Sequence, residues 1–181
     1  MRYRRVLKSG ASYFFTLVTH RRQCVFADYS HVRRWQAAIA KVQKNRPFTI
    51  EAEVILPDHL HVLWTMPGDD ADYATRIRLA KTFFTKSLDL RGATETANKS
   101  RAQKGERDVW QRRYWEHTIR DEHDFQMRLD YIHYNPVKHG LVKRATDWPH
   151  STFQEWVAKG VYEPWWGSDD MPPLPDWASA E

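Results

Sequence analysis

The chain alternates between segments with strand-like and helix-like spacing of apolar residues. Residues 12–19 are rich in aromatic and β-branched side chains, which predicts a buried strand. Residues 48–56 alternate in polarity, and we expect one face to carry Ile50, Ala52, Val54 and Leu56 and the other Thr49, Glu51 and Glu53. The turn-forming pair at 57–58 then leads into the apolar run 59–64, so the two segments predict an antiparallel hairpin.

Helical spacing accounts for much of the remaining chain. A first helix is expected from a cap at Ser30 to the break at residues 45–47, and a second over residues 71–90. Residues 110–119 predict another strand, and residues 124–135 repeat apolar side chains at helical spacing. Pro136 should end or kink that helix just after Asn135, and a short helix is expected over 151–158.

The length and composition are those of one domain with polar extensions. The 181 residues contain no internal repeat and allow one core of ordinary size. We place the domain at residues 1–150, with a basic arm at 1–10 and a mobile basic loop at 92–107, and assign 151–181 to a C-terminal helix and a Pro- and Trp-rich acidic tail. Cys24 is the only cysteine, which excludes an intrachain disulfide. No apolar stretch is long enough to span a bilayer and no export signal follows the basic N-terminus, so we expect a cytoplasmic protein.

The charge favours a polyanionic partner. The formal net charge is +5 and the pI about 9.3. Residues 1–22 hold basic and no acidic side chains, whereas residues 169–181 hold acidic and no basic ones. The second helix should expose a basic surface, which could follow a phosphate backbone or simply be solvated, made of Arg76, Arg78, Lys81 and Lys86. Aromatic residues beside arginines, such as Trp110 and Trp115, could stack on bases, although we expect most aromatic side chains to be core.

The run 56–64 contains two histidines, His59 and His61, in a strand-like pattern. Residues two apart on a strand project from the same face, so both imidazoles could reach one metal ion while Leu60, Val62 and Trp64 anchor the other face. The alternative is a pair of half-buried histidines that make ordinary hydrogen bonds.

The helix at 124–135 carries a second candidate group. Tyr131 and Asn135 are four residues apart and therefore share one helical face. A tyrosine hydroxyl one turn from an amide oxygen offers a nucleophile and a possible third metal ligand in one rigid unit, as required to aim an attacking oxygen at a metal-bound phosphate. The alternative is that Tyr131 is a core-edge aromatic.

Five stretches match the motifs of one protein family in order and spacing. They are YFFT (13–16), ILPDHLH (55–61), WEHTIR (115–120), YIHYNPVKHGLV (131–142) and DWPHSTF (147–153). In these motifs, which span most of its length, the chain resembles the REP-associated tyrosine transposases, a branch of the single-tyrosine HUH (IS200/IS605-like) transposases. The resemblance implies an α+β, ferredoxin-like fold, with helices packed on a central antiparallel sheet and Tyr131 facing the two histidines.

The resemblance also implies roles for individual residues. Tyr131 becomes the nucleophile, with Tyr134 as its rival, and Mg²⁺ or Mn²⁺ would be held by His59, His61 and Asn135. Asn135 stands where related enzymes often carry the longer glutamine. His133 and His139 are expected to be structural or to contact DNA. Contacts to DNA are expected from the basic arm, the second helix and the basic loop, namely from Arg2, Arg4, Arg5, Lys81, Lys99, Arg101 and Lys104.

The implied reaction is transesterification of single-stranded DNA at REP-type hairpins, through a 5′-phosphotyrosine and without ATP. No basic side chain identifies itself from the sequence as the group that deprotonates Tyr131. Two alternatives remain open: a hairpin-binding protein without turnover, and a metal-dependent phosphodiesterase that uses water. We expect a nucleoid-associated monomer or a dimer, and the acidic tail from Pro164 onward could fold across the basic cleft.

Overall fold

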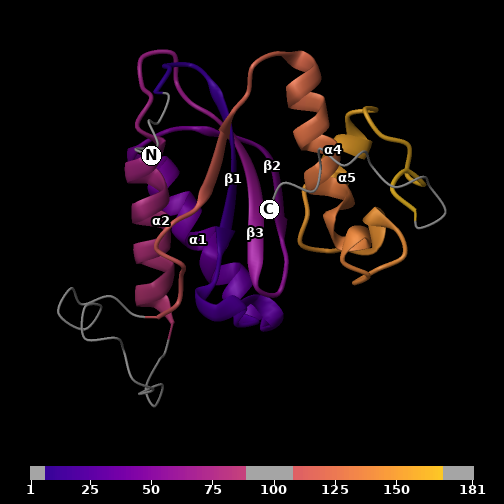
Figure 1. Ribbon diagram of the computed structural model, residues 1–181, viewed down its shortest axis with the longest axis horizontal. Coiled ribbons are helices and arrows are strands. Elements are labelled where there is room, and N and C mark those ends of the chain that lie inside the picture. The colour runs from indigo at the N-terminus through magenta and orange to yellow at the C-terminus, as the bar shows by residue number, and fades with distance from the viewer. Residues whose placement is uncertain (1–6, 89–107, 169–181) are drawn as a thin grey trace.

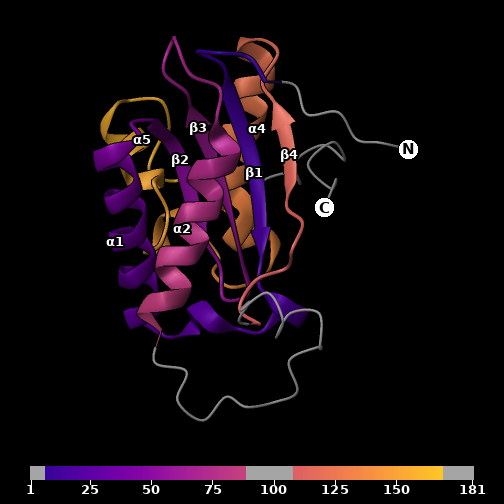
Figure 2. The ribbon, with the colours of Figure 1, turned by 90° about the vertical axis from the view of Figure 1, so that its left-hand side faces the viewer.

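A four-stranded antiparallel sheet forms the centre of the computed structural model, which describes residues 7–88 and 108–168. The strands, which pair in the order β2-β3-β1-β4, are β1 (Ser12–Val18), β2 (Thr49–Ile55), β3 (His59–Thr65) and β4 (Trp115–Thr118). Helices α1 (Tyr29–Asn45) and α2 (Tyr73–Ser87) cover one face, and α4 (Glu122–Lys138) and α5 (Phe153–Ala158) lie on the other (Figures 1 and 2). Short 3-10 turns occupy His20–Arg22, Val25–Ala27 and Ala145–Asp147. This order and pairing confirm the ferredoxin-like α+β fold.

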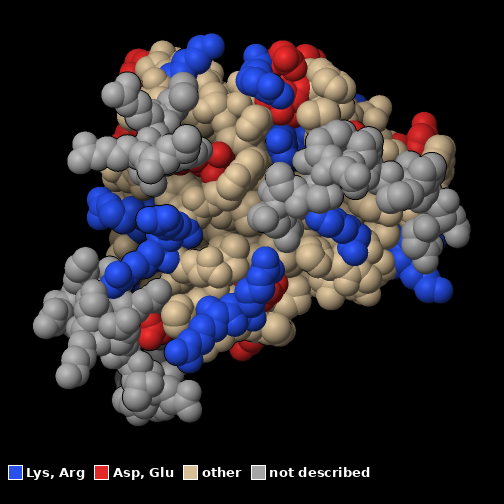
Figure 3. All heavy atoms as spheres, in the orientation of Figure 1, with Lys and Arg blue, Asp and Glu red and all other residues tan. Residues whose placement is uncertain are grey.

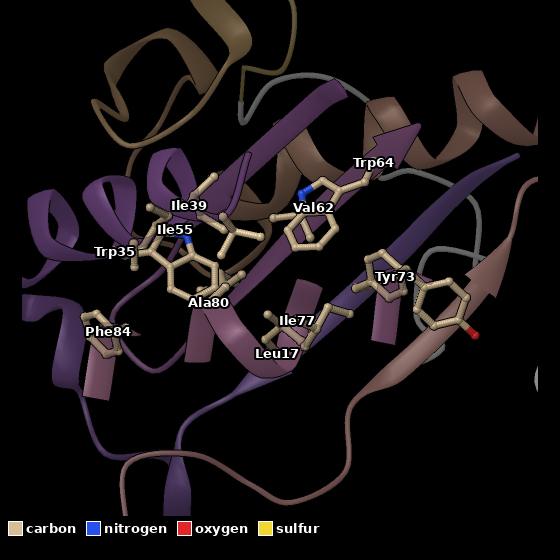
Figure 4. Close-up of a cluster of buried hydrophobic side chains, with 14 of the residues drawn as sticks. Leu17, Trp35, Ile39, Ile55, Val62, Trp64, Tyr73, Ile77, Ala80 and Phe84 are labelled. Carbon is tan, nitrogen blue, oxygen red and sulfur yellow. The ribbon is translucent and has the colours of Figure 1, made fainter. Parts of the chain in front are cut away.

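The larger core lies between the sheet and helices α1 and α2. Leu60, Val62 and Trp64 all point into it from β3, as the alternation of that strand predicted. Trp35 and Phe84 close it from the two helices (Figure 4). Burying each such aromatic side chain removes some 150–250 Å² of surface from water, so this layer anchors β3 firmly on the face opposite the histidines.

A second core covers the other face of the sheet. Phe14 and Leu63 meet Leu129 and Ile132 of α4 there. The chain beyond residue 150 joins this core, with members that include Phe153, Tyr162 and Trp166. Two indole hydrogen bonds join β2 to residues on either side of position 150, from Trp148 to the carbonyl of Ile55 at 3.0 Å and from Trp156 to that of Glu51 at 2.8 Å. The described residues after 150 are therefore part of the packed structure.

Strand β2 differs from its predicted alternation. Ile50 pairs with Trp64 and Ala52 with Leu63, so Glu51 is an extra residue in a β-bulge. Because a bulge shifts the side-chain alternation by one, Ile50 packs against the α1/α2 core while Ala52 faces the second core. The expectation that Ile50 and Ala52 share a face is wrong for this reason.

Two helix boundaries also differ from expectation. Asp28, not Ser30, caps α1, because its carboxylate accepts a hydrogen bond from the Ser30 amide at 2.8 Å. Helix α4 does not end at Asn135 but continues through Pro136 to Lys138. It ends where Gly140 adopts a φ of 66°, with its amide bonded to the Val137 carbonyl at 2.8 Å. Glycine, rather than proline, therefore ends this helix.

The predicted basic surface of α2 loses one member in the structure. Arg76 is 1% exposed and donates to the carbonyls of Arg46 and Pro47, at 3.2 and 2.9 Å, and to the Asp70 carboxylate at 2.8 Å. It ties α2 to the end of α1 because a buried guanidinium needs several acceptors. Among the described residues, no helix has the length and hydropathy needed to cross a membrane.

Candidate functional site

The two histidines lie side by side on β3, facing α4. His59 and His61 are 2% and 0% exposed, and their ring centroids are 5.0 Å apart with planes at 84°. The prediction that both imidazoles share one face is confirmed. Strand β3 is paired on both sides, by β2 and β1, so the backbone that carries the histidines is held on both edges.

Each histidine is oriented through its Nδ1 atom. His59 Nδ1 lies 2.6 Å from Asp58 Oδ1, and Arg22 binds the other oxygen of that carboxylate at 3.2 Å. Burial acts to raise the pKa of Asp58, but the hydrogen bonds from His59 and Arg22 outweigh it and hold the pKa below its usual value. The ionised carboxylate accepts the Nδ1 proton, so Nε2 becomes the candidate ligand atom of His59.

His61 is fixed by a neighbouring strand. Its Nδ1 lies 2.9 Å from Thr16 Oγ1 on β1, and both residues are buried. With Nδ1 engaged in this way, Nε2 is the candidate ligand atom of His61 as well. The sequence pattern pointed to the histidines but not to Asp58 and Thr16 as the side chains that orient them.

Helix α4 places three polar residues opposite the histidines. Tyr131, Asn135 and His139 follow one another at intervals of four, and so lie on one face of the helix and its C-terminal cap. The Tyr131 ring lies 5.0 Å from that of His61, and the His139 ring lies 5.2 Å from that of His59, centroid to centroid. Asn135 is therefore one helical turn from each of the two contacts.

Asn135 has the environment of a ligand. It is 0% exposed, and neither its side-chain oxygen nor its nitrogen has a hydrogen-bond partner among the described residues. Leaving an amide buried in that way costs about 1–3 kcal/mol, which a bound cation would offset through the oxygen. Within residues 7–88 and 108–168, no three His, Cys, Asp or Glu side chains gather around a metal position. Two imidazoles and an amide oxygen nevertheless make a donor set that suits a divalent ion such as Mn²⁺.

Two cations lie around Tyr131. Lys138 Nζ is 4.9 Å from the centroid of the Tyr131 ring. The guanidinium carbon of Arg128 lies 5.5 Å from the Phe14 ring centroid, and Phe14 is 5.8 Å from Tyr131. Burial lowers the pKa of Arg128, whereas the nearby Asp124 and Tyr131 oppose that shift. Arg128 lies three residues before Tyr131 and Lys138 seven residues after it, so helical spacing places both on the Tyr131 side of α4. This spacing could have identified both cations from the sequence.

The two neighbouring residues on α4 point elsewhere. The half-buried Tyr134 meets Trp166 of the C-terminal segment, with ring centroids 6.4 Å apart. His133 is 0% exposed and its Nε2 lies 2.9 Å from Thr152 Oγ1. Burial lowers the pKa of His133 to about 3, so this imidazole stays neutral within the second core.

The one predicted DNA contact among the described residues, Lys81, is not part of this site. Lys81 lies on α2, on the far side of the sheet, where its Nζ donates to the Gln111 carbonyl at 2.8 Å and lies 5.2 Å from the Trp110 ring centroid. Lysine and arginine are spread over the face shown in Figure 3, with fewer acidic groups between them. The acidic tail beyond residue 168 and the other predicted contacts lie outside the described residues; these contacts are Arg2, Arg4, Arg5, Lys99, Arg101 and Lys104.

Comparison with known proteins agrees with this fold. The family model for IS200-like transposases matches residues 8–135. A REP-associated tyrosine transposase of Escherichia coli (strain K12) is 41% identical over 169 residues, which are 92% of this chain and 91% of that protein. The solved structure of a REP-associated tyrosine transposase bound to a REP hairpin is 38% identical, with a TM-score of 0.74 over 96% of this chain and 94% of that one. The chain therefore belongs to the IS200-like transposases, in their REP-associated tyrosine transposase branch, and is a DNA-processing enzyme.

Proposed function

We propose that the protein is a metal-dependent transposase that cleaves and rejoins single-stranded DNA at REP-type hairpins, with Tyr131 as its nucleophile. The observation that carries this proposal is the contact between the Tyr131 and His61 rings, with centroids 5.0 Å apart, one helical turn from the buried amide of Asn135. A tyrosine that only filled the core would need neither the histidine pair nor the amide beside it.

His59, His61 and Asn135 are the residues that would hold the metal. When bound, Mg²⁺ or Mn²⁺ acts as a Lewis acid on the scissile phosphate. Asp58 and Thr16 hold the Nδ1 atoms of the two histidines, so that both rings keep one orientation. The rigid strand and helix that carry these residues supply the positioning on which phosphoryl transfer depends.

Tyr131 carries out the covalent step. Its phenolic oxygen forms a bond to phosphorus as the bond from phosphorus to the 3′ oxygen breaks; the phenol loses its proton to solvent and the departing oxygen takes one up. The products are a 5′-phosphotyrosine and a free 3′-hydroxyl, and the same steps in reverse rejoin a strand. Arg128, which interacts electrostatically with Tyr131, and Lys138, whose Nζ lies 4.9 Å from the Tyr131 ring centroid, stabilise the negative charge that develops around the phenol and the phosphate.

The family and the charge support this substrate class. The relative of 38% identity was solved with a REP hairpin, and the formal net charge of this chain is +5. Single-stranded DNA with a hairpin is the polyanion that fits both facts. The contacts to it come from the basic residues predicted from the sequence, together with those around Tyr131.

Two other functions make different predictions. A hairpin-binding protein without turnover would bind DNA and leave it intact. A phosphodiesterase that uses water would cut DNA without attaching to it, and replacing Tyr131 would not stop the cut. The position of Tyr131 against His61, where a nucleophile is needed, favours the transposase.

The test uses end-labelled single-stranded hairpin DNAs and Mn²⁺, with denaturing gels to reveal a covalent adduct. Tyr131→Phe removes only the hydroxyl, and Tyr134→Phe makes the same change on the same helix, away from the histidines. We expect an adduct in the wild type and in Tyr134→Phe and none in Tyr131→Phe. Binding without adduct or cleavage would favour the binding protein, and cleavage by Tyr131→Phe would favour the phosphodiesterase.

A further inference from the structure

Strand β4 carries two aromatic side chains on the Tyr131 side of the sheet edge. It is four residues long and pairs with β1 alone, so it forms one edge of the sheet. Trp115 and His117, two residues apart, share the face that Phe14 of β1 occupies, with ring centroids 5.5 Å apart between Trp115 and Phe14. Trp115 is 36% exposed although it lies beside a core. A large ring is thus left open to solvent next to the candidate site.

The two rings are stacked in parallel, and together they form an aromatic surface near the nucleophile. The planes of Trp115 and His117 are within 5° of each other, with centroids 5.8 Å apart. Phe14 bridges this surface to the site, since its ring centroid is 5.8 Å from that of Tyr131 and 5.5 Å from that of His61. A flat group that stacked on Trp115 would lie two ring contacts from Tyr131.

A buried carboxylate holds the surrounding groups in place. Asp124 is 1% exposed, and its Oδ2 accepts from His117 Nε2 at 2.7 Å and from the Arg120 backbone amide at 3.0 Å. The Nε atoms of Arg120 and Arg128 lie 3.2 and 3.7 Å from the same carboxylate. One side chain therefore fixes the His117 ring and keeps two guanidinium groups beside it, so the surface is preorganised before any ligand binds.

Arg128 has capacity left for a further partner. It is 9% exposed, and its guanidinium carbon lies 5.4 Å from the Trp115 ring centroid. Its Nε faces Asp124 at 3.7 Å, an ion pair too long for a hydrogen bond. A buried guanidinium held by one long ion pair is only partly compensated, and a second anion would complete it. A phosphate is the anion that accompanies a stacking base.

We infer that Trp115 and His117 bind an unpaired base of the DNA strand next to the phosphate that Tyr131 attacks, and that Arg128 binds a phosphate of the same segment. This inference rests on the proposed function and adds to it the residues that hold the strand at the cleavage point. An open tryptophan bordered by two arginines is the combination that proteins use for single-stranded nucleic acid. An apolar protein partner would not need the two guanidinium groups.

The test measures equilibrium binding in EDTA, so that no chemistry takes place. Fluorescein-labelled DNA hairpins with single-stranded flanks are used intact and with one base removed at each unpaired position in turn. The variants are Trp115→Ala, Trp115→Phe and the control Trp165→Ala, which removes another exposed tryptophan, 66% exposed, in the C-terminal segment. Thermal unfolding shows whether each variant is folded.

Stacking on one base corresponds to a loss of about ten- to a hundredfold in affinity when the ring is removed. We expect that loss for Trp115→Ala on intact DNA, a much smaller loss for Trp115→Phe and none for Trp165→Ala. At one unpaired position, removing the base should abolish the difference between wild type and Trp115→Ala. In Arg128→Gln, the slope of log affinity against log salt should fall by about one, as for a lost phosphate contact.

Two results would overturn the inference: equal binding by Trp115→Ala and Trp165→Ala, or a loss in Trp115→Ala that persists whichever base is missing. The second result indicates a purely structural role. If Trp115→Ala does not fold, Trp115→Leu and Trp115→Phe are compared in the same scan, since both keep apolar bulk and only one keeps a ring. The gel assay tests the proposed function, and a missing adduct there would contradict that function without changing the binding result. Failure of the proposed function and failure of this inference are therefore distinguishable.

Discussion

Replacing Thr16 by valine removes one hydroxyl from the strand beside the histidine pair. Thr16 Oγ1 lies 2.9 Å from His61 Nδ1, and the two residues are 6% and 0% exposed. Valine keeps the shape and the β-branch, so the strand itself should persist. Water has little access to the position, and His61 therefore loses the group that fixes its tautomer and ring orientation.

The size of the effect follows from this geometry. Removing the hydrogen-bond partner of a metal-binding histidine typically lowers metal affinity by about ten- to a hundredfold, or roughly 1.4–2.8 kcal/mol. The buried Nδ1 left behind adds a loss of about 1–3 kcal/mol to the free energy of unfolding. Both losses should be present in Thr16→Val, and only the first depends on metal.

The assay is a Mn²⁺ titration in which electron paramagnetic resonance measures the free ion. Thr65→Val is the matched control, because Thr65 Oγ1 also makes a hydroxyl contact between β3 and β1, with Ser12 Oγ at 2.7 Å. We expect weaker Mn²⁺ binding in Thr16→Val and wild-type binding in Thr65→Val. The reasoning is refuted if Thr16→Val binds Mn²⁺ like the wild type, or if the two variants weaken binding equally.

Two further predictions concern stability. Burial raises the pKa of Glu53 to about 7, so the stability that its protonated form provides is complete below the unfolded value of 4.5 and is lost as the pH rises through 7. The free energy of unfolding of Glu53→Gln, relative to that of the wild type, should therefore increase by about 3 kcal/mol from pH 4.5 to pH 8, as measured by denaturant unfolding. A difference between the two proteins that does not change with pH would contradict this. Gly167 has a φ of 72°, and an added Cβ would lie 2.9 Å from that of Ala145. Gly167→Ala should thus have a lower melting temperature than Gly160→Ala, because at Gly160 φ is 74° and nothing lies within 4 Å of the added Cβ. Equal melting temperatures would contradict the predicted clash with Ala145.

Local patterns predicted the parts of the fold and site that depend on neighbours in sequence. The strand at residues 59–64 and the side of the sheet that each of its residues faces followed from alternation alone, because the strand period is two. The shared face of Tyr131 and Asn135 followed from the helical period in the same way. The contact between that helix face and the histidines was predicted from the family resemblance, since periodicity does not say which elements pack together.

The features that sequence reasoning missed depend on distant partners. The bulge in β2 shows only in its register with β3, and Arg76 is buried because carbonyls from the end of α1 surround it. His139 meets His59 only because α4 runs on past Pro136. Arg128 could be located from its spacing to Tyr131, but its place over Trp115 required the structure.

The central claim is that Tyr131 forms the covalent bond to DNA, and mass spectrometry of the digested adduct tests it most directly. Wild-type protein is incubated with hairpin DNA and Mn²⁺, digested with nuclease and protease, and each tyrosine peptide is searched for an attached nucleotide. The account predicts a 5′-linked nucleotide on the peptide containing Tyr131, at that residue. A nucleotide on Tyr134, or DNA cleaved with no tyrosine modified, would contradict it.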